Sequence, residues 1–214
     1  MSLRYLRHNM SLAAKAPFQR VMRQGRMEQF INAMDLQEGT RILDMGGAAE
    51  FWESCPVPLD LTVVNLPDAI SDVSPPKQHE VKIVEGDACN MSFVEDQSFD
   101  IAFSNSVIEH VGNAEKRAAF AREMHRAAPR HWVQTPSIWF PIEAHNHMPF
   151  WWFYPPGMKR RIINGWRKKL PEWTEMIEGT TVVMRKEIET LYPDSKIWVE
   201  RVVGIPKSYV AHSI

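Results

Sequence analysis

Small or polar residues lie at the ends of several short apolar stretches of the sequence, and together they could hold a nucleoside-like cofactor. The stretches are residues 41–47, 60–68, 80–88 and 99–106. Glycine and alanine let a ligand approach the backbone closely, whereas Asn, Asp and Ser side chains form hydrogen bonds with hydroxyl and amino groups. The candidate binding residues are Asp44, Gly46, Gly47, Ala48, Asn65, Asp87, Ala88, Ser104 and Asn105.

The glycine pair is not followed by residues that bind a diphosphate. A dinucleotide-binding loop has the pattern G-x-G-x-x-G and a P-loop ends in a lysine, but here Gly46 and Gly47 lead into Ala48 and Glu50. The Glu50 carboxylate would lie near the phosphates and repel them. S-adenosylmethionine carries no phosphate, so the loop suits it better than NAD, and a nicotinamide-dependent oxidoreductase is disfavoured. A plain strand-to-helix turn that binds nothing stays open.

Polar residues further along the chain suit the other parts of the same cofactor. Asn65 lies within the second stretch, 21 residues after Asp44, where a side chain that binds ribose hydroxyls is expected. Asp87 could accept a hydrogen bond from the adenine amino group, while the Ala88 N–H meets a ring nitrogen. Ser104 and Asn105 end the fourth stretch, beside the expected position of the methyl group. Asp87 is equally able to act as a turn cap, and that alternative stays open.

Two further segments carry groups that could take a proton. His110 follows the fourth stretch, and an imidazole is suited to proton transfer near neutral pH. Glu143 and His145 lie in the segment IEAHNHM. We name these three residues as catalytic candidates, against the alternative that they only pack within their loops. His147 adds a third ionisable group there, but such sets are common in ordinary loops, so we expect no metal site.

The order of the elements predicts an α/β fold. The apolar stretches recur about every 20 residues, which suits parallel strands joined by crossovers of a dozen or so residues. Alternating strands and helices form a doubly wound sheet, in which ligands bind at the carboxyl ends of the strands. The crossover over 69–78 is expected to be a turn of helix and a loop. The later elements expected are a helix over 114–128 capped by Asn113, a strand over 131–136, a helix over 184–193 and strands over 196–205 and 207–214.

The length of 214 residues suits one globular domain with a sizeable core. A helix is expected over residues 11–36, broken near Pro17. We therefore interpret residues 1–38 as an N-terminal helical cover and residues 39–214 as the ligand-binding domain. The oligomeric state is left open.

Composition excludes several classes of protein. A net charge of -1 gives no global attraction for nucleic acid. Cys55 and Cys89 lie apart without metal-ligand spacing, which suits a reducing compartment. Because the sequence has no apolar run of about 18 residues and no signal peptide pattern, we expect a cytoplasmic protein.

Residues 137–161 are rich in aromatic residues and proline, and we expect an irregular insertion that covers the site. Basic residues follow at Lys159, Arg160, Arg161, Arg167, Lys168 and Lys169. Aromatic and basic side chains together could meet an anionic membrane or a phosphate-bearing, lipid-linked acceptor. The alternative is a solvated helix with a buried aromatic side, and both stay open.

At these residues the sequence resembles the class I S-adenosylmethionine-dependent methyltransferases, and more closely a bacterial type 11-like branch. The motifs are ILDMGGAAEFW, GDACNM, FDIAFSNSVIEHVG, QTP, FPIEAH and KSYVA, and the block SNSVIEHVG is the most specific of them. The resemblance spans residue 40 to the end. It implies that residues 39–214 form the methyltransferase domain.

This resemblance implies a Rossmann-like, seven-stranded, mostly parallel sheet, with the last strand inserted antiparallel and the insertion after the fifth strand. It implies S-adenosyl-L-methionine as cofactor, with Asp44, Gly46 and Gly47 at the methionine tail. It also implies methyl transfer to oxygen or nitrogen of a small molecule, possibly a saccharide or a lipid-linked intermediate. Ala48, Glu50 and Asn65 depart from the wider class, so a non-catalytic binding protein with a weakened cofactor site is the alternative.

Overall fold

The computed structural model describes residues 21–47, 49–67 and 75–213, and for Glu50 the backbone only. Several expectations concern residues outside these ranges. They are the first part of the N-terminal cover with Pro17, the Ala48 position, the Glu50 side chain and most of the crossover over 69–78.

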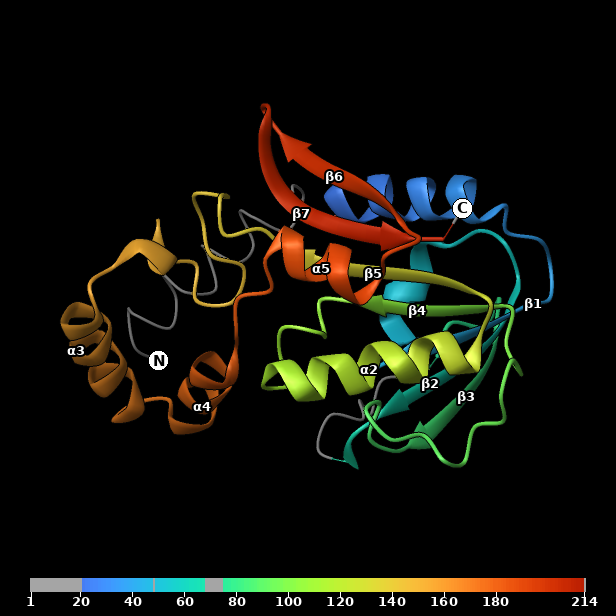
Figure 1. The fold of residues 1–214 in the computed structure, drawn as a ribbon, viewed down its shortest axis with the longest axis horizontal. Coiled ribbons are helices and arrows are strands. Elements are labelled where there is room, and N and C mark those ends of the chain that lie inside the picture. Colours follow the sequence, from blue (N-terminus) through green and yellow to red (C-terminus); the bar gives the residue numbers. More distant parts are fainter. Residues whose placement is uncertain (1–20, 48, 68–74, 214) are drawn as a thin grey trace.

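A seven-stranded sheet in the order β3-β2-β1-β4-β5-β7-β6 forms the centre of the molecule (Figure 1). The strands β1 to β5 pair in parallel, whereas β7 runs antiparallel between β5 and β6, which confirms the architecture that the resemblance implies. The strands are β1 (Thr40–Met45), β2 (Leu59–Asn65), β3 (Glu80–Glu85), β4 (Ile101–Asn105), β5 (Arg130–Pro136), β6 (Lys196–Val202) and β7 (Ile205–His212).

The central strands are apolar because both faces of the sheet are covered. On one face, the helices α2 (Ala114–Ala127) and α5 (Arg185–Leu191) pack Phe120 and Ile188 into the core. On the other face, the helix over residues 21–34 and the 3₁₀ helix η1 (Ala49–Ser54) contribute Phe30 and Trp52. This confirms the doubly wound arrangement.

Local sequence signals set the ends of the predicted helices. The Asn113 side chain accepts a hydrogen bond from the Lys116 backbone N–H, so Asn113 is the N-cap of α2 as expected. The helix expected over 184–193 is α5, which ends before Pro193. Since proline lacks an N–H, it does not continue a helix.

The prediction of an irregular insertion was wrong in part. The 3₁₀ helix η3 (Trp151–Phe153) is followed by the helices α3 (Pro156–Arg167) and α4 (Pro171–Gly179). Each of these two helices has a proline in its first turn, where the missing N–H costs no hydrogen bond. Figure 1 shows α3 and α4 beyond the carboxyl ends of the parallel strands, set apart from the sheet.

No helix within the described ranges combines the length and the apolar character needed to cross a membrane.

Candidate active site

A first cavity of about 370 Å³ lies at the carboxyl ends of β1 to β4. Such a volume falls within the range of small-molecule sites. Its position matches the crevice in which doubly wound sheets bind ligands. The lining residues that the sequence predicted are Gly46, Asn65, Asp87 and Ala88, and the cavity also exposes Ser106, Val107, His110 and Lys116.

The two glycines are each required by a close neighbour. Gly46 has φ +82°, a left-handed backbone conformation that glycine adopts without strain, and a Cβ there would lie 2.5 Å from a Val107 methyl carbon. A Cβ on Gly47 would overlap the oxygens of the Asp44 carboxylate. The glycine pair therefore brings the bare backbone of this loop against the strand end and the edge of the first cavity.

Asp44 supports this loop from below and does not line either cavity. Its side chain is buried, and the Trp52 Nε1–H donates a hydrogen bond of 2.8 Å to Oδ2. Burial raises the pKa of Asp44 to about 7, an effect that the Trp52 hydrogen bond partly offsets. The second oxygen, Oδ1, has no hydrogen-bond partner among the described residues.

Asn65 and Asp87 line the first cavity and also hold its loops. The Asn65 amide donates a hydrogen bond of 3.0 Å to the Gly47 carbonyl, which ties the strand end to the glycine loop. The Asp87 carboxylate accepts a hydrogen bond from the Cys89 N–H, and its other oxygen lies 3.5 Å from Lys116 Nζ. Asp87 is thus a turn cap whose side chain also borders the cavity.

The side chains at the end of β4 lie in different surroundings. Ser104 is fully buried, lines neither cavity, and its hydroxyl has no partner among the described residues. Asn105 faces a second cavity, where its side-chain oxygen accepts a hydrogen bond of 2.6 Å from Arg26. Alternate side chains of a strand point to opposite sides of the sheet, so Ser104 lies in the core while Asn105 faces the cavity. Ser106, the next residue, lines both cavities.

The second cavity measures about 450 Å³ and lies beside the first. Its wall combines cations with aromatic rings. At its base, Glu200 accepts hydrogen bonds from Arg26 at 2.8 Å and from Lys207 at 3.2 Å. The wall includes the side chains of Arg23, Arg26, Asn105, Gln134, Phe140, Glu143, His147, Trp152 and Lys207.

The structure brings the three catalytic candidates together. Glu143 accepts a hydrogen bond from His145 Nδ1 at 2.9 Å, and His145 Nε2 lies 2.9 Å from His110 Nε2. On the far side of its ring, His110 Nδ1 lies 3.3 Å from the Thr180 hydroxyl. Glu143 lines the second cavity and His110 lines the first.

Burial and the neighbouring charges set the protonation of this cluster. Burial lowers the pKa of His110 to about 4, and the charge of His145 adds to this effect. Burial opposes the charged form of His145, but the hydrogen bond and charge of Glu143 together with the charge of Glu109 outweigh it, so the pKa of His145 is raised. The pKa of Glu143 is lowered by His145 and by the backbone N–H groups of His145 and Asn146, against the opposing effect of burial.

Sequence reasoning did not name Glu109 as a site residue. Glu109 is buried, accepts a hydrogen bond from Thr135, and has an oxygen 3.9 Å from His145 Nε2. Burial raises the pKa of Glu109 to about 7. Its place directly before His110 was the available signal.

Arg26 and Lys207 were also missed. The partner of Arg26, Glu200, is distant in sequence, whereas Lys207 meets Glu200 between the adjacent strands β6 and β7. One signal was present for Arg26, which lies four residues after Met22 and four before Phe30 on a helix. A charged residue on an otherwise apolar helix face is expected to have a buried partner.

Comparison with known proteins agrees with this geometry. Residues 36–130 match the family model of a methyltransferase domain, type 11. No curated protein matches the chain. An S-adenosylmethionine-dependent methyltransferase of Thermotoga maritima superposes with a TM-score of 0.58 at 13% identity, over 98% of this chain and 95% of that one. A second such enzyme, from Aquifex aeolicus, has a TM-score of 0.50 at 16% identity, over 87% of each chain.

A third similar structure is a phosphoethanolamine N-methyltransferase of Haemonchus contortus in complex with phosphomonomethylethanolamine and S-adenosylhomocysteine. Its TM-score is 0.53 at 16% identity, and the match covers 77% of this chain and 35% of that one. At such identities the structures establish the fold and leave the acceptor open. The family match therefore identifies a methyltransferase domain over residues 36–130, and the similar structures share its fold.

Proposed function

We propose that the chain transfers a methyl group from S-adenosylmethionine in the first cavity to an oxygen or nitrogen of a small acceptor in the second. One observation carries this proposal: the two cavities are neighbours and share Ser106. Methyl transfer is a direct displacement, so catalysis depends on holding the two reactants close and in line. Adjoining cavities provide that arrangement.

The residues of the first cavity fit the cofactor. The backbone of Gly46 and Gly47 is suited to the methionine tail, with Asp44 fixing the loop. Asn65 is placed for the ribose. When bound, the cofactor supplies an electrophilic methyl group on a sulfonium.

The residues proposed for the adenine and for the surroundings of the methyl group lie at the ends of later strands. Asp87 and Ala88 border the cavity where the adenine would lie. Ser104 supports the end of β4 from the core, and Asn105 extends into the second cavity on the acceptor side.

The cluster of Glu143, His145 and His110 activates the acceptor in this proposal. Glu143 fixes the His145 ring through Nδ1, and the two Nε2 atoms face each other at 2.9 Å. When the acceptor is methylated, the imidazole pair would take up the proton that the acceptor atom loses. The Glu143 carboxylate then stabilises the resulting imidazolium.

The second cavity favours an acceptor with a negative charge. Arg26 and Lys207 share the single carboxylate of Glu200, so one positive charge there is not neutralised. Arg23 adds another at the rim. Phosphate and carboxylate groups are the usual partners of such cations.

The same wall carries Trp152 and Phe140 beside the amides of Asn105 and Gln134. Aromatic faces next to planar polar groups suit a sugar ring, because its apolar face packs on them while its hydroxyls form hydrogen bonds. We infer that the acceptor is a saccharide bearing a phosphate, of the kind that a lipid carrier holds.

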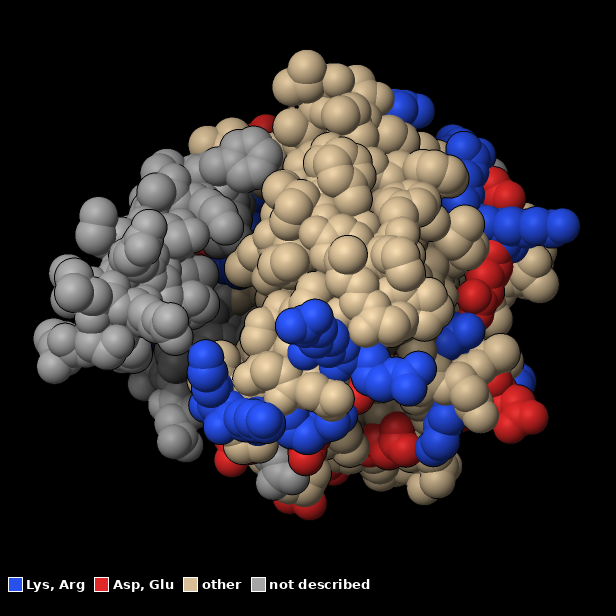
Figure 2. Space-filling model, turned by 90° about the vertical axis from the view of Figure 1, so that its left-hand side faces the viewer, with Lys and Arg blue, Asp and Glu red and all other residues tan. Residues whose placement is uncertain are grey.

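The exposed aromatic side chains on the outer face of the insertion are compatible with a lipid-linked acceptor. Trp139, Phe150 and Phe153 are each more than half exposed, and Trp139 contacts Phe153. Figure 2 shows a broad area without charged side chains on this face, bordered below by Lys and Arg and on the right by side chains of both charges. Exposed aromatic residues beside cations suit contact with an anionic lipid surface.

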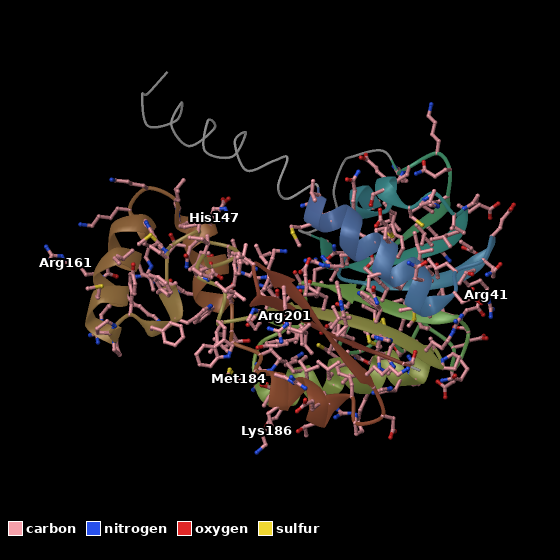
Figure 3. The ribbon with its side chains drawn as sticks, turned by 90° about the horizontal axis from the view of Figure 1, so that it is seen from above. Arg41, His147, Arg161, Met184, Lys186 and Arg201 are labelled. Carbon is pink, nitrogen blue, oxygen red and sulfur yellow. The ribbon has the colours of Figure 1, made fainter. Side chains whose placement is uncertain are left out.

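The cations on and after α3 differ in whether they can contact an anionic lipid surface. Lys159 lies over the Trp151 and Trp152 rings, and Arg167 pairs with Glu178. Arg160, Arg161, Lys168 and Lys169 are exposed and form no ion pair within the described part of the chain. Figure 3 shows Arg161 directed outward at the end of the molecule.

Calorimetry with S-adenosylmethionine tests the cofactor site. We expect binding of the wild type, and about 10-fold weaker binding by Asp87→Asn, because a hydrogen bond to a charged group is lost while the turn cap is kept. The control Asp60→Asn, at the amino end of β2, should bind as the wild type does. No binding by the wild type at millimolar ligand would refute the proposal.

Sedimentation with vesicles containing 30% phosphatidylserine tests the lipid contact. Replacing the four cations Arg160, Arg161, Lys168 and Lys169 with serine should weaken binding at least 10-fold, since each contributes about 1 kcal/mol near an anionic surface. The control replaces Lys77, Lys82, Arg122 and Lys186. Equal binding by both variants would exclude this face as the contact.

A further inference from the structure

We propose that Glu109, His110 and His145 form a binding site for a divalent transition-metal ion. One nitrogen from each imidazole and one carboxylate oxygen lie within 4.8 Å of one another. Two histidines and one carboxylate are a common ligand set for such ions, and they leave further coordination positions open. The set differs from the sequence-level candidates, because His147 does not belong to it and Glu109 does.

The distances agree with a shared cation. His110 Nε2 and His145 Nε2 are 2.9 Å apart. Ligands that bind one ion at about 2.1 Å are separated by roughly 3 Å when they occupy adjacent positions. Glu109 Oε1 lies 3.9 Å from His145 Nε2, so a side-chain movement of about 1 Å would complete the set.

Both histidines are fixed through the nitrogen that a metal would not use. His145 Nδ1 is hydrogen-bonded to Glu143, and His110 Nδ1 lies beside the Thr180 hydroxyl. In metal sites the second ring nitrogen is nearly always held in this way, which directs the other nitrogen at the ion. A hydrogen bond between the two imidazoles would not require that both Nδ1 atoms also have partners. The contacts with Glu143 and Thr180 therefore favour a metal site.

Glu109 supplies an independent observation. Its side chain is 2% exposed, and Oε1 has no hydrogen-bond partner among the described residues. Leaving a buried carboxylate oxygen unpaired is costly, whereas a cation beside it removes that cost. Oε1 is also the oxygen that lies 3.9 Å from His145 Nε2. The unsatisfied atom therefore lies where the ion would bind.

The location of the ion fits a role in activating the acceptor, and this role rests on the proposed function. His110 lines the first cavity, and Glu143, which holds His145, lines the second. A cation between them lowers the pKa of an acceptor hydroxyl beside it, and the hydroxyl proton leaves to water. With the ion bound, this effect replaces proton uptake by the imidazole pair.

Titration of the full chain with Co²⁺, after removal of metals with a chelator, tests the site. Absorbance in the visible range reports cobalt bound to nitrogen and oxygen ligands, and calorimetry gives the stoichiometry. We expect one ion per chain, and binding at least 100-fold weaker in both His145→Ala and Glu109→Gln. Glu143→Gln should weaken binding by about 10-fold or more, because it removes an outer support.

A second pair of histidines provides the control. His125 and His131 form an edge-to-face contact much like that of His110 and His145, with ring centroids 4.9 Å apart against 4.6 Å. Within the described residues, no carboxylate completes a metal-binding set with them. The His125→Ala variant should bind Co²⁺ as tightly as the wild type.

Two results would overturn the metal site: no Co²⁺ binding by the wild type at 1 mM, or equal affinity in the wild type and His145→Ala. Circular dichroism of each variant shows whether it is folded. Calorimetry with S-adenosylmethionine on the metal-free protein separates the two proposals, because cofactor binding without any cobalt binding removes the metal site and leaves methyl transfer standing.

Discussion

The two cavities are built from different kinds of structure. The first is formed by turns that directly follow consecutive parallel strands, with glycine and short polar residues at their tips. The second is formed by long side chains from the helix over 21–34, from β5, from the insertion and from β7. The cofactor side therefore depends on local backbone geometry. The acceptor side depends on side chains that meet only in the folded chain.

Different interactions should therefore determine how each cavity responds to a substitution. A change in the first cavity should act through steric fit, since Gly46 and Gly47 have no room for a side chain. In the second cavity, a change should act through buried charge, because Arg26 and Lys207 depend on Glu200. Stability measurements on single variants test this contrast.

We expect the largest effect from Glu200→Ala. The variant leaves Arg26 and Lys207 in a buried region without their carboxylate, and breaking a buried ion pair costs about 3–5 kcal/mol. Urea unfolding should show this loss in the free energy of unfolding. Binding of S-adenosylmethionine should change less than about 2-fold at temperatures where the variant is folded, because Glu200 does not line the first cavity.

Glu189→Ala is the matched control for that variant. It breaks the exposed pair of Glu189 with Arg185 on α5, which should cost less than about 0.5 kcal/mol. If both variants lost the same small amount of stability, the buried charges would not determine the second cavity.

Gly47→Ala should have the next largest effect. The new Cβ would overlap the Asp44 carboxylate, which cannot move away because it is buried and held by Trp52. We expect a loss of roughly 2–4 kcal/mol in the free energy of unfolding, as for other overpacked buried sites. Binding of S-adenosylmethionine should weaken in parallel. Unchanged stability and binding would contradict the close approach of the loop to the strand end.

Asp44 also predicts a dependence of stability on pH. Burial raises its pKa to about 7 in the folded protein, above the usual value near 3.8. A carboxyl group with a raised folded pKa stabilises the fold fully below its unfolded pKa, and this contribution is lost as the pH rises through the folded pKa. The wild type should therefore lose stability relative to Asp44→Asn between about pH 4 and pH 7.

The difference should reach about 2–4 kcal/mol, since one pKa unit corresponds to about 1.4 kcal/mol. Urea unfolding at pH 4.5 and pH 8 without cofactor measures it. Asp100→Asn gives the opposite sign, because Arg41 lowers the pKa of Asp100 and that stabilisation is lost on acidification. A pH-independent difference between the wild type and Asp44→Asn would show that Asp44 does not titrate in this range.

The same contrast explains how much the sequence could predict. The strands that carry Gly46, Asn65 and Asp87 have short-range signals, namely an apolar run ending in a turn, and they lie where expected. The sequence also pointed to His110, Glu143 and His145, which do meet.

The rest depended on contacts that no local pattern records. The side on which Asn105 and Ser104 lie depends on the register of β4 within the sheet. The partner of Arg26 is on β6, far along the chain. The helices α3 and α4 were missed in part because α3 has no buried residue, and its half-buried Trp166 packs against Trp173 of α4 rather than on the sheet.

The smallest expected effect comes from Gly165→Ala, the same change as at Gly47 but placed in α3. Nothing lies within 4 Å of a Cβ at Gly165, and its backbone is helical. Alanine should therefore stabilise the helix by about 0.5–1 kcal/mol. In urea unfolding the two glycine variants should thus move in opposite directions. A loss of stability in Gly165→Ala would mean that α3 packs against another surface, and the open face assigned to lipid contact would then be covered.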